Sequence, residues 1–142
     1  MAFRIWLFVS GLLALSALMA AAYGAHQLKW YAPGTMKLYE TAQLYHMVHA
    51  MALFGLAVLF AATDGRRRLW AGLLLNVAAL GFVAGIAMFS GGLYYEVFAG
   101  VKPQIQIVPM GGLAFMTGWA AVSLATFGFR RQPPSIEPRS EK

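Results

Sequence analysis

The sequence predicts an all-α integral membrane protein in which four transmembrane helices form one compact bundle. Hydrophobic residues make up 60% of the chain and charged residues only 11%, whereas an ordinary soluble domain has roughly 25% charged residues. Four runs contain no charged residue, and they cover residues 5–25, 41–63, 69–95 and 105–129. Each run reaches the ~20 residues that a helix needs to cross the hydrocarbon core of a bilayer. None shows the alternation of apolar and polar residues that marks a strand of a membrane barrel.

The first run, residues 5–25, has two interpretations. It follows Arg4, and the alanines at 20–22 would suit a signal peptidase. A secretory signal, however, has an apolar core of only ~7–15 residues. Because this run is longer, we predict a first spanning helix.

The other three runs are separated by short polar segments, which leave no room for a soluble module. The second run begins at Thr41, the third follows the three arginines at 66–68, and the fourth contains Pro109 near its start. Because proline has no N–H and disfavours a helical residue before it, we expect residues 107–108 to be irregular and this connection to enter the outer leaflet. The domain therefore spans residues 1–129, and the polar, proline-rich residues 130–142 should form a disordered cytoplasmic tail.

Basic residues predict the orientation, because cytoplasmic loops are enriched in Lys and Arg. Eight of the 11 basic residues lie at the two termini or between the second and third runs, and Lys29, Lys37 and Lys102 lie in the first and third connections. Both termini should therefore be cytoplasmic. The net charge of +6 is explained by these flanks, so no nucleic-acid partner is expected. The chain has no cysteine, which excludes disulfides and thiolate metal sites.

Polar and small residues gather where the runs should meet the outer half of the membrane. The clusters read AAYGAHQL (21–28), TAQLYHMVHAMALF (41–54), MFSGGLYY (88–95) and VPMGGLAFMTGW (108–119). In these clusters the chain resembles a family of small bacterial membrane proteins, the YgdD/YwdK-like domain-of-unknown-function family 423, over about residues 5–128. The family pattern matches at the following residues: His26, His49, Gly91, Tyr94, Pro109, Gly111, Gly112, Gly118 and Trp119.

This resemblance implies the four-helix fold and a bacterial inner-membrane location, but it brings no activity. His46 departs from the family, which usually has Gln there, and Glu96 stands at a place that is usually apolar. A function built on a pair of His46 and His49 would therefore not be a family function.

His46 and His49 are nevertheless the most notable polar residues. They are three residues apart, so they lie toward one side of a helix, with Tyr45 one turn before His49. One interpretation is that each imidazole hydrogen bonds to a neighbouring helix. The other is a site for a proton, a metal, haem or a quinone, since neutral imidazole is a metal ligand that titrates near physiological pH. The residues of this candidate site are His26, Tyr45, His46, His49 and Tyr94.

Glycine patterns predict close helix packing. GFVAG (81–85) is a GxxxG pattern, and such small residues let membrane helices approach each other. The packing residues that we expect are Gly81, Gly85, Gly91, Gly92, Gly111, Gly112 and Gly118. Gly111 and Gly112 have a second interpretation, in which a helix start presents free backbone N–H groups to an anion or a carbonyl.

Together these patterns favour a non-catalytic accessory or structural protein of the membrane, one that packs with itself or in a larger complex. We expect Gly81 and Gly85 to contribute to that association. The sequence contains no nucleophile with a neighbouring base and no phosphate-binding loop, so no enzyme activity and no cofactor are predicted. The alternative is a small binding or transport protein that uses the histidine and tyrosine site.

Overall fold

The structure is a computed structural model that describes residues 2–28 and 32–130. The elements in chain order are α1 (Ala2–Gln27), α2 (Pro33–Ala62), α3 (Leu69–Gly85), the π-helical turn η1 (Ile86–Ser90), α4 (Gly91–Ala99), α5 (Ile107–Ala125) and the 3₁₀ turn η2 (Thr126–Gly128). Four stretches are long and apolar enough to cross a membrane: Ala2–Gln27, Pro33–Ala62, Leu69–Ala99 and Ile107–Gly128. The predicted all-α fold of four spanning helices is confirmed.

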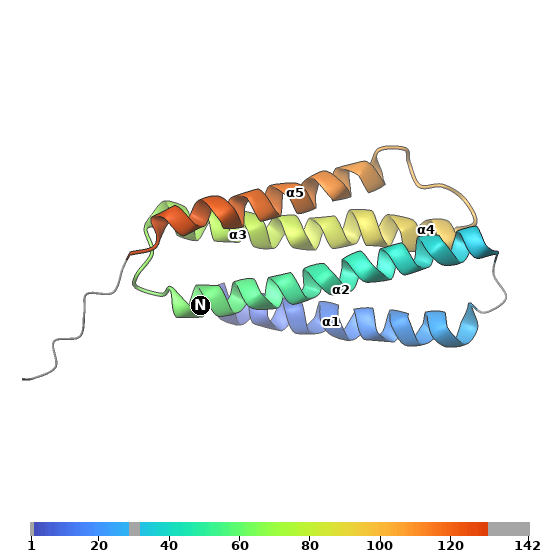
Figure 1. Ribbon diagram of the computed structural model, residues 1–142, viewed down its shortest axis with the longest axis horizontal. Helices are drawn as coiled ribbons and strands as arrows, with labels where there is room; N and C mark the ends of the chain where they lie inside the picture. Colours follow the sequence, from blue (N-terminus) through green and yellow to red (C-terminus); the bar gives the residue numbers. More distant parts are fainter. Residues whose placement is uncertain (1, 29–31, 131–142) are drawn as a thin grey trace, which may run out of the picture.

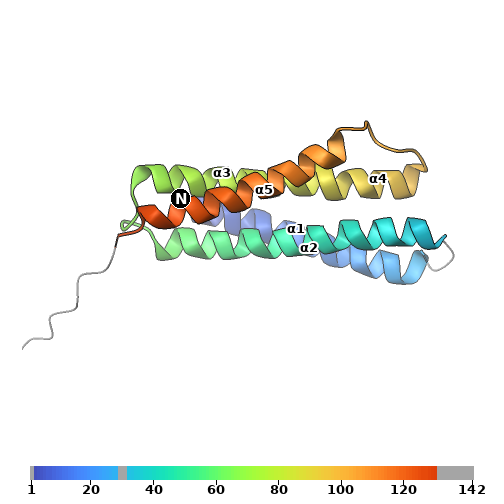
Figure 2. The same ribbon diagram turned by 45° about the horizontal axis from the view of Figure 1, so that its top comes forward.

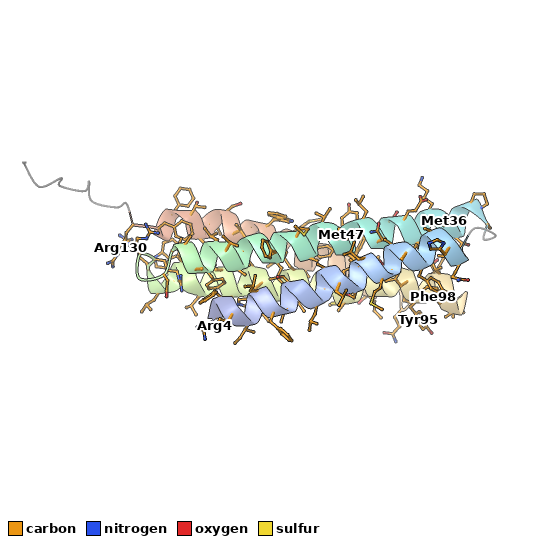
Figure 3. The ribbon with its side chains drawn as sticks, turned by 90° about the horizontal axis from the view of Figure 1, so that it is seen from below. Arg4, Met36, Met47, Tyr95, Phe98 and Arg130 are labelled. Carbon is orange, nitrogen blue, oxygen red and sulfur yellow. The ribbon has the colours of Figure 1, made fainter. Side chains whose placement is uncertain are left out.

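The four spans lie side by side and alternate in direction (Figure 1). α1 packs mainly on α2, and α3 packs mainly on α5, while α2 joins the two pairs through α3, η1 and α4. Figure 2, a turned view of the same ribbon, shows that α5 crosses over α3. Arg4 and Arg130 lie at one end of the bundle, and Met36 and Tyr95 lie at the other (Figure 3). Lys29, Trp30 and the predicted tail beyond Arg130 lie outside the described residues.

The pairing of α1 with α2 depends on small residues at heptad spacing. The buried residues of α1 are Ser10, Ala17 and Gly24, and a period of seven places them along one face. Tyr39 of α2 lies over Gly24, and its hydroxyl donates a hydrogen bond of 2.5 Å to the Ala20 carbonyl oxygen. The rest of α1 exposes large apolar side chains, as expected for a helix that faces lipid.

Three boundaries differ from the sequence prediction. α2 begins at Pro33 rather than near Thr41, because proline fits the first turn of a helix, so Lys37 is helical. The third span continues through the glycines at 91–92 to Ala99, because η1 absorbs one extra residue: the Gly91 N–H bonds to the Ile86 carbonyl oxygen. α5 begins at Ile107, so Pro109 lies in its first turn, where a missing N–H is tolerated.

The expectation that residues 107–108 are irregular is therefore wrong. The irregular segment is residues 100–106, which folds back so that Pro103 reaches the start of α4 beside Gly92. Gly100 begins this segment with φ +66°, and its N–H bonds to the Glu96 carbonyl oxygen at 3.1 Å. A left-handed glycine at this place ends a helix without the steric conflict that a Cβ would create.

Candidate functional site

His49 is held on all sides by aromatic residues of α3 and α5. Its ring stacks on Phe115 with centroids 3.5 Å apart and planes 13° from parallel, and Phe82 lies 5.6 Å away, centroid to centroid. The Trp119 indole N–H donates to His49 Nε2 at 3.2 Å. His49 Nδ1 lies 2.9 Å from the Tyr45 carbonyl oxygen, so Nδ1 carries the proton and Nε2 accepts.

Both ring nitrogens of His49 are thus engaged in one neutral tautomer. A metal or haem iron would need a free ring nitrogen, and His49 could offer one only by breaking a contact that joins α2 to α5. The side chain is 4% exposed. This arrangement supports a structural role for His49.

His46 takes the opposite tautomer. Its Nε2 lies 3.3 Å from Ser16 Oγ of α1, and that hydroxyl gives its own proton to the Leu13 carbonyl oxygen at 2.9 Å. With the Ser16 proton on that carbonyl, His46 Nε2 donates to Ser16 Oγ, and Nδ1 is left as an acceptor. Nδ1 is buried and has no hydrogen-bond partner among the described residues.

Two buried hydroxyls also lack a hydrogen-bond partner among the described residues. Ser90 Oγ and Tyr94 Oη have no hydrogen-bond partner within residues 2–28 and 32–130, and Ser90 is 0% exposed. Tyr94 follows Ser90 by four residues, so both lie on one face of the third span. The Tyr94 ring meets the His46 ring edge-on, with centroids 6.2 Å apart.

The five residues proposed as one site are therefore separated into three places. His46 and Tyr94 are neighbours. Tyr45 and His49 stack on each other 5.9 Å apart, centroid to centroid, and Tyr45 contributes its carbonyl oxygen rather than its hydroxyl. His26 is exposed near the end of α1. Among the described residues, no three His, Cys, Asp or Glu side chains are grouped so that they could hold a metal ion.

Several polar contacts were missed from the sequence. Ser16 carried no signal, because a serine in an apolar helix usually bonds to its own backbone. The Trp6 indole donates to Asn76 Oδ1 at 3.1 Å and so ties α1 to α3. A tryptophan near a helix end usually indicates an interfacial anchor, and only the packing of α1 shows this second use.

Most of the predicted packing glycines pack against other helices of the same chain. A Cβ on Gly81 would lie 2.8 Å from the Ala114 carbonyl oxygen and 3.1 Å from Gly118 Cα. Glycines with similarly close neighbours are Gly85 and Gly118, where a Cβ would meet the Phe115 and Phe82 rings, Gly111, against the Phe89 backbone, and Gly92, against Val108. Because α5 fills the face of α3 that carries the GxxxG pattern, Gly81 and Gly85 are not available to pack against another protein.

Two glycines of that prediction have looser surroundings. A Cβ would have its nearest neighbour at 3.8 Å on Gly91 and at 3.9 Å on Gly112. Gly111 and Gly112 also lie inside α5 rather than at its start. Their N–H groups belong to the helix, so the anion-binding interpretation does not fit them.

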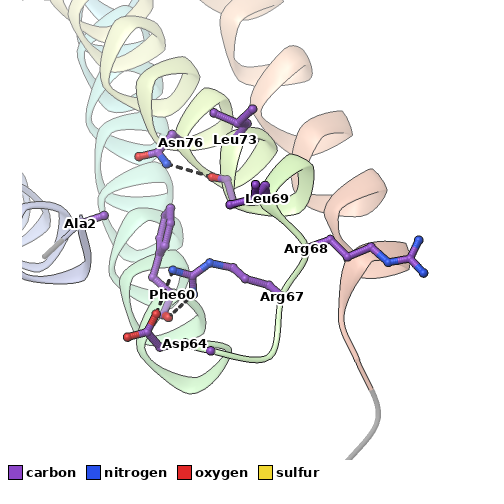
Figure 4. Close-up of a pocket in the computed structure, with 10 residues that line it drawn as sticks. Ala2, Phe60, Asp64, Arg67, Arg68, Leu69, Leu73 and Asn76 are labelled. Carbon is purple, nitrogen blue, oxygen red and sulfur yellow. Dashed lines mark hydrogen bonds and ion pairs between the residues drawn. The ribbon is translucent and has the colours of Figure 1, made fainter.

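A pocket of about 560 Å³ opens at the end of the bundle that carries Arg4 and Arg130. Figure 4 shows Arg67 reaching across it toward Phe60 and Asp64. The Arg67 guanidinium donates to the Phe60 carbonyl oxygen at 2.7 Å and to Thr63 Oγ1 at 3.1 Å, and it pairs with Asp64 Oδ1 at 3.3 Å. Arg67 thus satisfies one of the last carbonyls of α2, so an arginine predicted to set the topology also has a structural role.

A second hollow lies between α2 and α5. It has a volume of about 250 Å³ and is lined by apolar residues of α2, α3 and α5: Ala52, Gly55, Leu56, Leu59, Phe82, Trp119 and Val122. α2 and α5 are joined by the His49–Trp119 hydrogen bond, and Trp119 also lines the hollow. We call this hollow the α2–α5 groove.

Comparisons with known proteins indicate one family of membrane proteins. The model of one family, described as a protein of unknown function (DUF423), matches residues 20–112. A protein of Staphylococcus aureus, named UPF0382 membrane protein, is 33% identical over 89% of this chain and 98% of its own. The UPF0382 membrane protein YwdK of Bacillus subtilis is 32% identical over 86% of this chain and 95% of its own. No solved structure matches the chain.

Proposed function

The chain belongs to the DUF423 family, and we propose that it is a non-catalytic accessory protein of the membrane. In this proposal it works by binding another transmembrane helix in the α2–α5 groove. The resemblance inferred from the four sequence clusters is confirmed. The protein is an integral membrane protein of the bacterial cytoplasmic membrane. The partner is either a second copy or a different subunit.

The observation that carries this proposal is Gly55. A glycine inside a helix is about 0.5–1 kcal/mol less favourable than alanine. Gly24, Gly81 and Gly85 have a reason to be glycine within the chain, because a Cβ there would collide with a neighbouring helix. Gly55 has no such reason, since nothing lies within 4 Å of a Cβ placed on it. Gly11 and Gly34 are equally open, but neither of them lines the α2–α5 groove.

The position of Gly55 indicates what would use it. It lies in the α2–α5 groove beside Ala52, with Leu59 one turn further on, and small residues at a lipid-facing surface are where membrane helices pack closely. Trp119 forms the opposite wall, 47% exposed, although a tryptophan facing lipid is expected at the interfaces rather than in the middle of a span. A transmembrane helix laid along the groove would cover both residues.

The alternative function, a small binding or transport protein, loses most of its predicted site. His49 has both ring nitrogens engaged, and His26 lies apart from the other four residues. The geometry therefore favours packing over ligand binding for these residues. His46 and Tyr94 are the two that keep an unpaired polar atom.

Substitution of Gly55 by Leu tests the proposal, with Gly11→Leu as the matched control. Both glycines are exposed and open, so both changes should leave the folded protein at least as stable, given the higher helix propensity of Leu. After gentle extraction into lipid discs, native mass spectrometry should show that Gly55→Leu loses the associated species and that Gly11→Leu keeps it. Association that survives Gly55→Leu would contradict the groove as the interface, and loss with Gly11→Leu alone would move the interface to α1.

A further inference from the structure

Three buried polar atoms of α2, η1 and α4, which pack on one another, have no hydrogen-bond partner among the described residues. They are His46 Nδ1 of α2, Ser90 Oγ at the end of η1, and Tyr94 Oη of α4. Buried polar groups are nearly always hydrogen bonded, and leaving one unpaired costs about 1–3 kcal/mol. Three such atoms in neighbouring residues therefore indicate a shared partner rather than three separate defects.

The backbone at this point supports the same conclusion. A serine in an apolar helix normally donates to the carbonyl oxygen one turn earlier. At Ser90 that carbonyl is Ile86 O, which accepts the Gly91 N–H in the π-helical turn, and the Ser90 hydroxyl does not bond to it. Single π turns inside α-helices occur frequently at functional sites, and this one leaves the Ser90 hydroxyl available to another partner.

The chemistry of the three atoms specifies that partner. His46 Nδ1 is an acceptor, because His46 Nε2 uses the ring proton toward Ser16. The hydroxyls of Ser90 and Tyr94 can each donate or accept. A single partner for all three atoms must therefore donate to Nδ1 and hydrogen bond to the two hydroxyls, as a hydroxyl group can and a metal cation or a carbonyl, which has no proton to donate, cannot.

The burial of the three atoms limits the size of the partner that can reach them. All three atoms are buried beneath the surface of the bundle, so the hydroxyl of a lipid head group could not reach them from outside. Water fits such a place when two to four polar partners converge. One water spans a gap of about 5 Å between two polar atoms, given hydrogen bonds of ~2.7–2.8 Å.

We propose that His46, Ser90 and Tyr94 form a binding site for one resident water molecule inside the outer half of the bundle. The water donates to His46 Nδ1 and accepts from a hydroxyl of the third span. Through it, Ser16 of α1, His46 of α2 and the η1–α4 segment become one hydrogen-bonded junction. This role is independent of the helix partner proposed for the α2–α5 groove.

Solid-state nuclear magnetic resonance of protein labelled with ¹⁵N-histidine, reconstituted in lipid bilayers, tests the site. The chain has only three histidines, and His26→Gln leaves the two of interest. We expect magnetisation transfer from water to the His46 side chain and little to His49, whose nitrogens bond to protein. Absence of transfer to His46 would overturn the proposal.

Two conservative variants distinguish a shared water from a direct contact. Ser90→Ala and Tyr94→Phe should each shift the His46 Nδ1 signal, because each removes one hydrogen bond to the water. Thr117→Val is the matched control, since that hydroxyl bonds to the Leu113 carbonyl oxygen on the exposed side of α5. An unchanged His49 signal verifies folding. A shift with Tyr94→Phe and none with Ser90→Ala would show a direct bond from Tyr94 to His46 and contradict the shared water.

Discussion

Replacing His49 by Phe isolates the hydrogen bond between α2 and α5. Phenylalanine keeps an aromatic ring stacked on Phe115. It therefore replaces the present stacking contact, whose centroids are 3.5 Å apart, with another aromatic one. What is lost is the acceptor for the Trp119 indole N–H, now 3.2 Å from His49 Nε2. The Tyr45 carbonyl oxygen loses only a second hydrogen bond, because it also lies within the α2 backbone ladder.

The expected magnitude follows from the group left unpaired. A buried donor without its acceptor costs about 1–3 kcal/mol, and hydrogen bonds between membrane helices average nearer 0.6 kcal/mol with a maximum near 1.7. We therefore expect His49→Phe to lower the free energy of unfolding by about 1–2 kcal/mol. His49→Ala also removes the stacked ring, worth about 0.5–1.5 kcal/mol, and opens a cavity, so it should lower the free energy of unfolding by about 3 kcal/mol.

Equilibrium unfolding in mixed micelles measures these changes, and a double-mutant cycle assigns them. Trp119→Phe removes the donor, so the double variant His49→Phe with Trp119→Phe should be less destabilised than the sum of the two single variants. His46→Gln is the comparison, because Gln keeps a hydrogen-bonding group at that place, and it should be tolerated better than His49→Ala. Strict additivity in the cycle would refute the hydrogen bond, and equal tolerance of His46→Gln and His49→Ala would refute the structural role of His49.

Two further predictions concern packing and topology. Gly81→Ala should lower the free energy of unfolding by about 1–3 kcal/mol, because its Cβ would lie 2.8 Å from a backbone oxygen, whereas Gly112→Ala, with its nearest neighbour at 3.9 Å, should be neutral or stabilising; thermal unfolding in detergent compares them. Single cysteines in this cysteine-free chain should be labelled by an impermeant thiol reagent in intact cells at Lys102 and not at Asp64, and the reverse pattern would overturn the predicted orientation.

The fold could be predicted because the bilayer imposes a length on each span. Uncharged runs of about 20 or more residues determine the number of spanning helices. They do not determine where a helix begins outside the hydrocarbon core. Pro33 starts α2 about two turns before the apolar run because its backbone suits a first turn. No sequence pattern predicted the π turn at 86–90, which lies where η1 packs against α2 and α5.

The candidate site could be predicted only in part, for a geometric reason. Residues three apart on an α-helix differ by about 60° around its axis. That offset is small on an isolated helix, but α2 has neighbours on both sides, so His46 turns to Ser16 of α1 and His49 turns to Trp119 of α5. The sequence indicated two polar residues on one side of a helix, and it contained no information on which helices would lie beside them.

The mass of the protein in a native membrane environment tests the central claim most directly. The unmodified protein, extracted with its surrounding lipid and without strong detergent, should be recovered in a species larger than the single 15.4 kDa chain. Mass spectrometry of that species should identify either a second copy or another membrane subunit, held through the α2–α5 groove. A monodisperse single chain that carries haem or one tightly bound metal ion would contradict the account and return the histidines to the role of ligands.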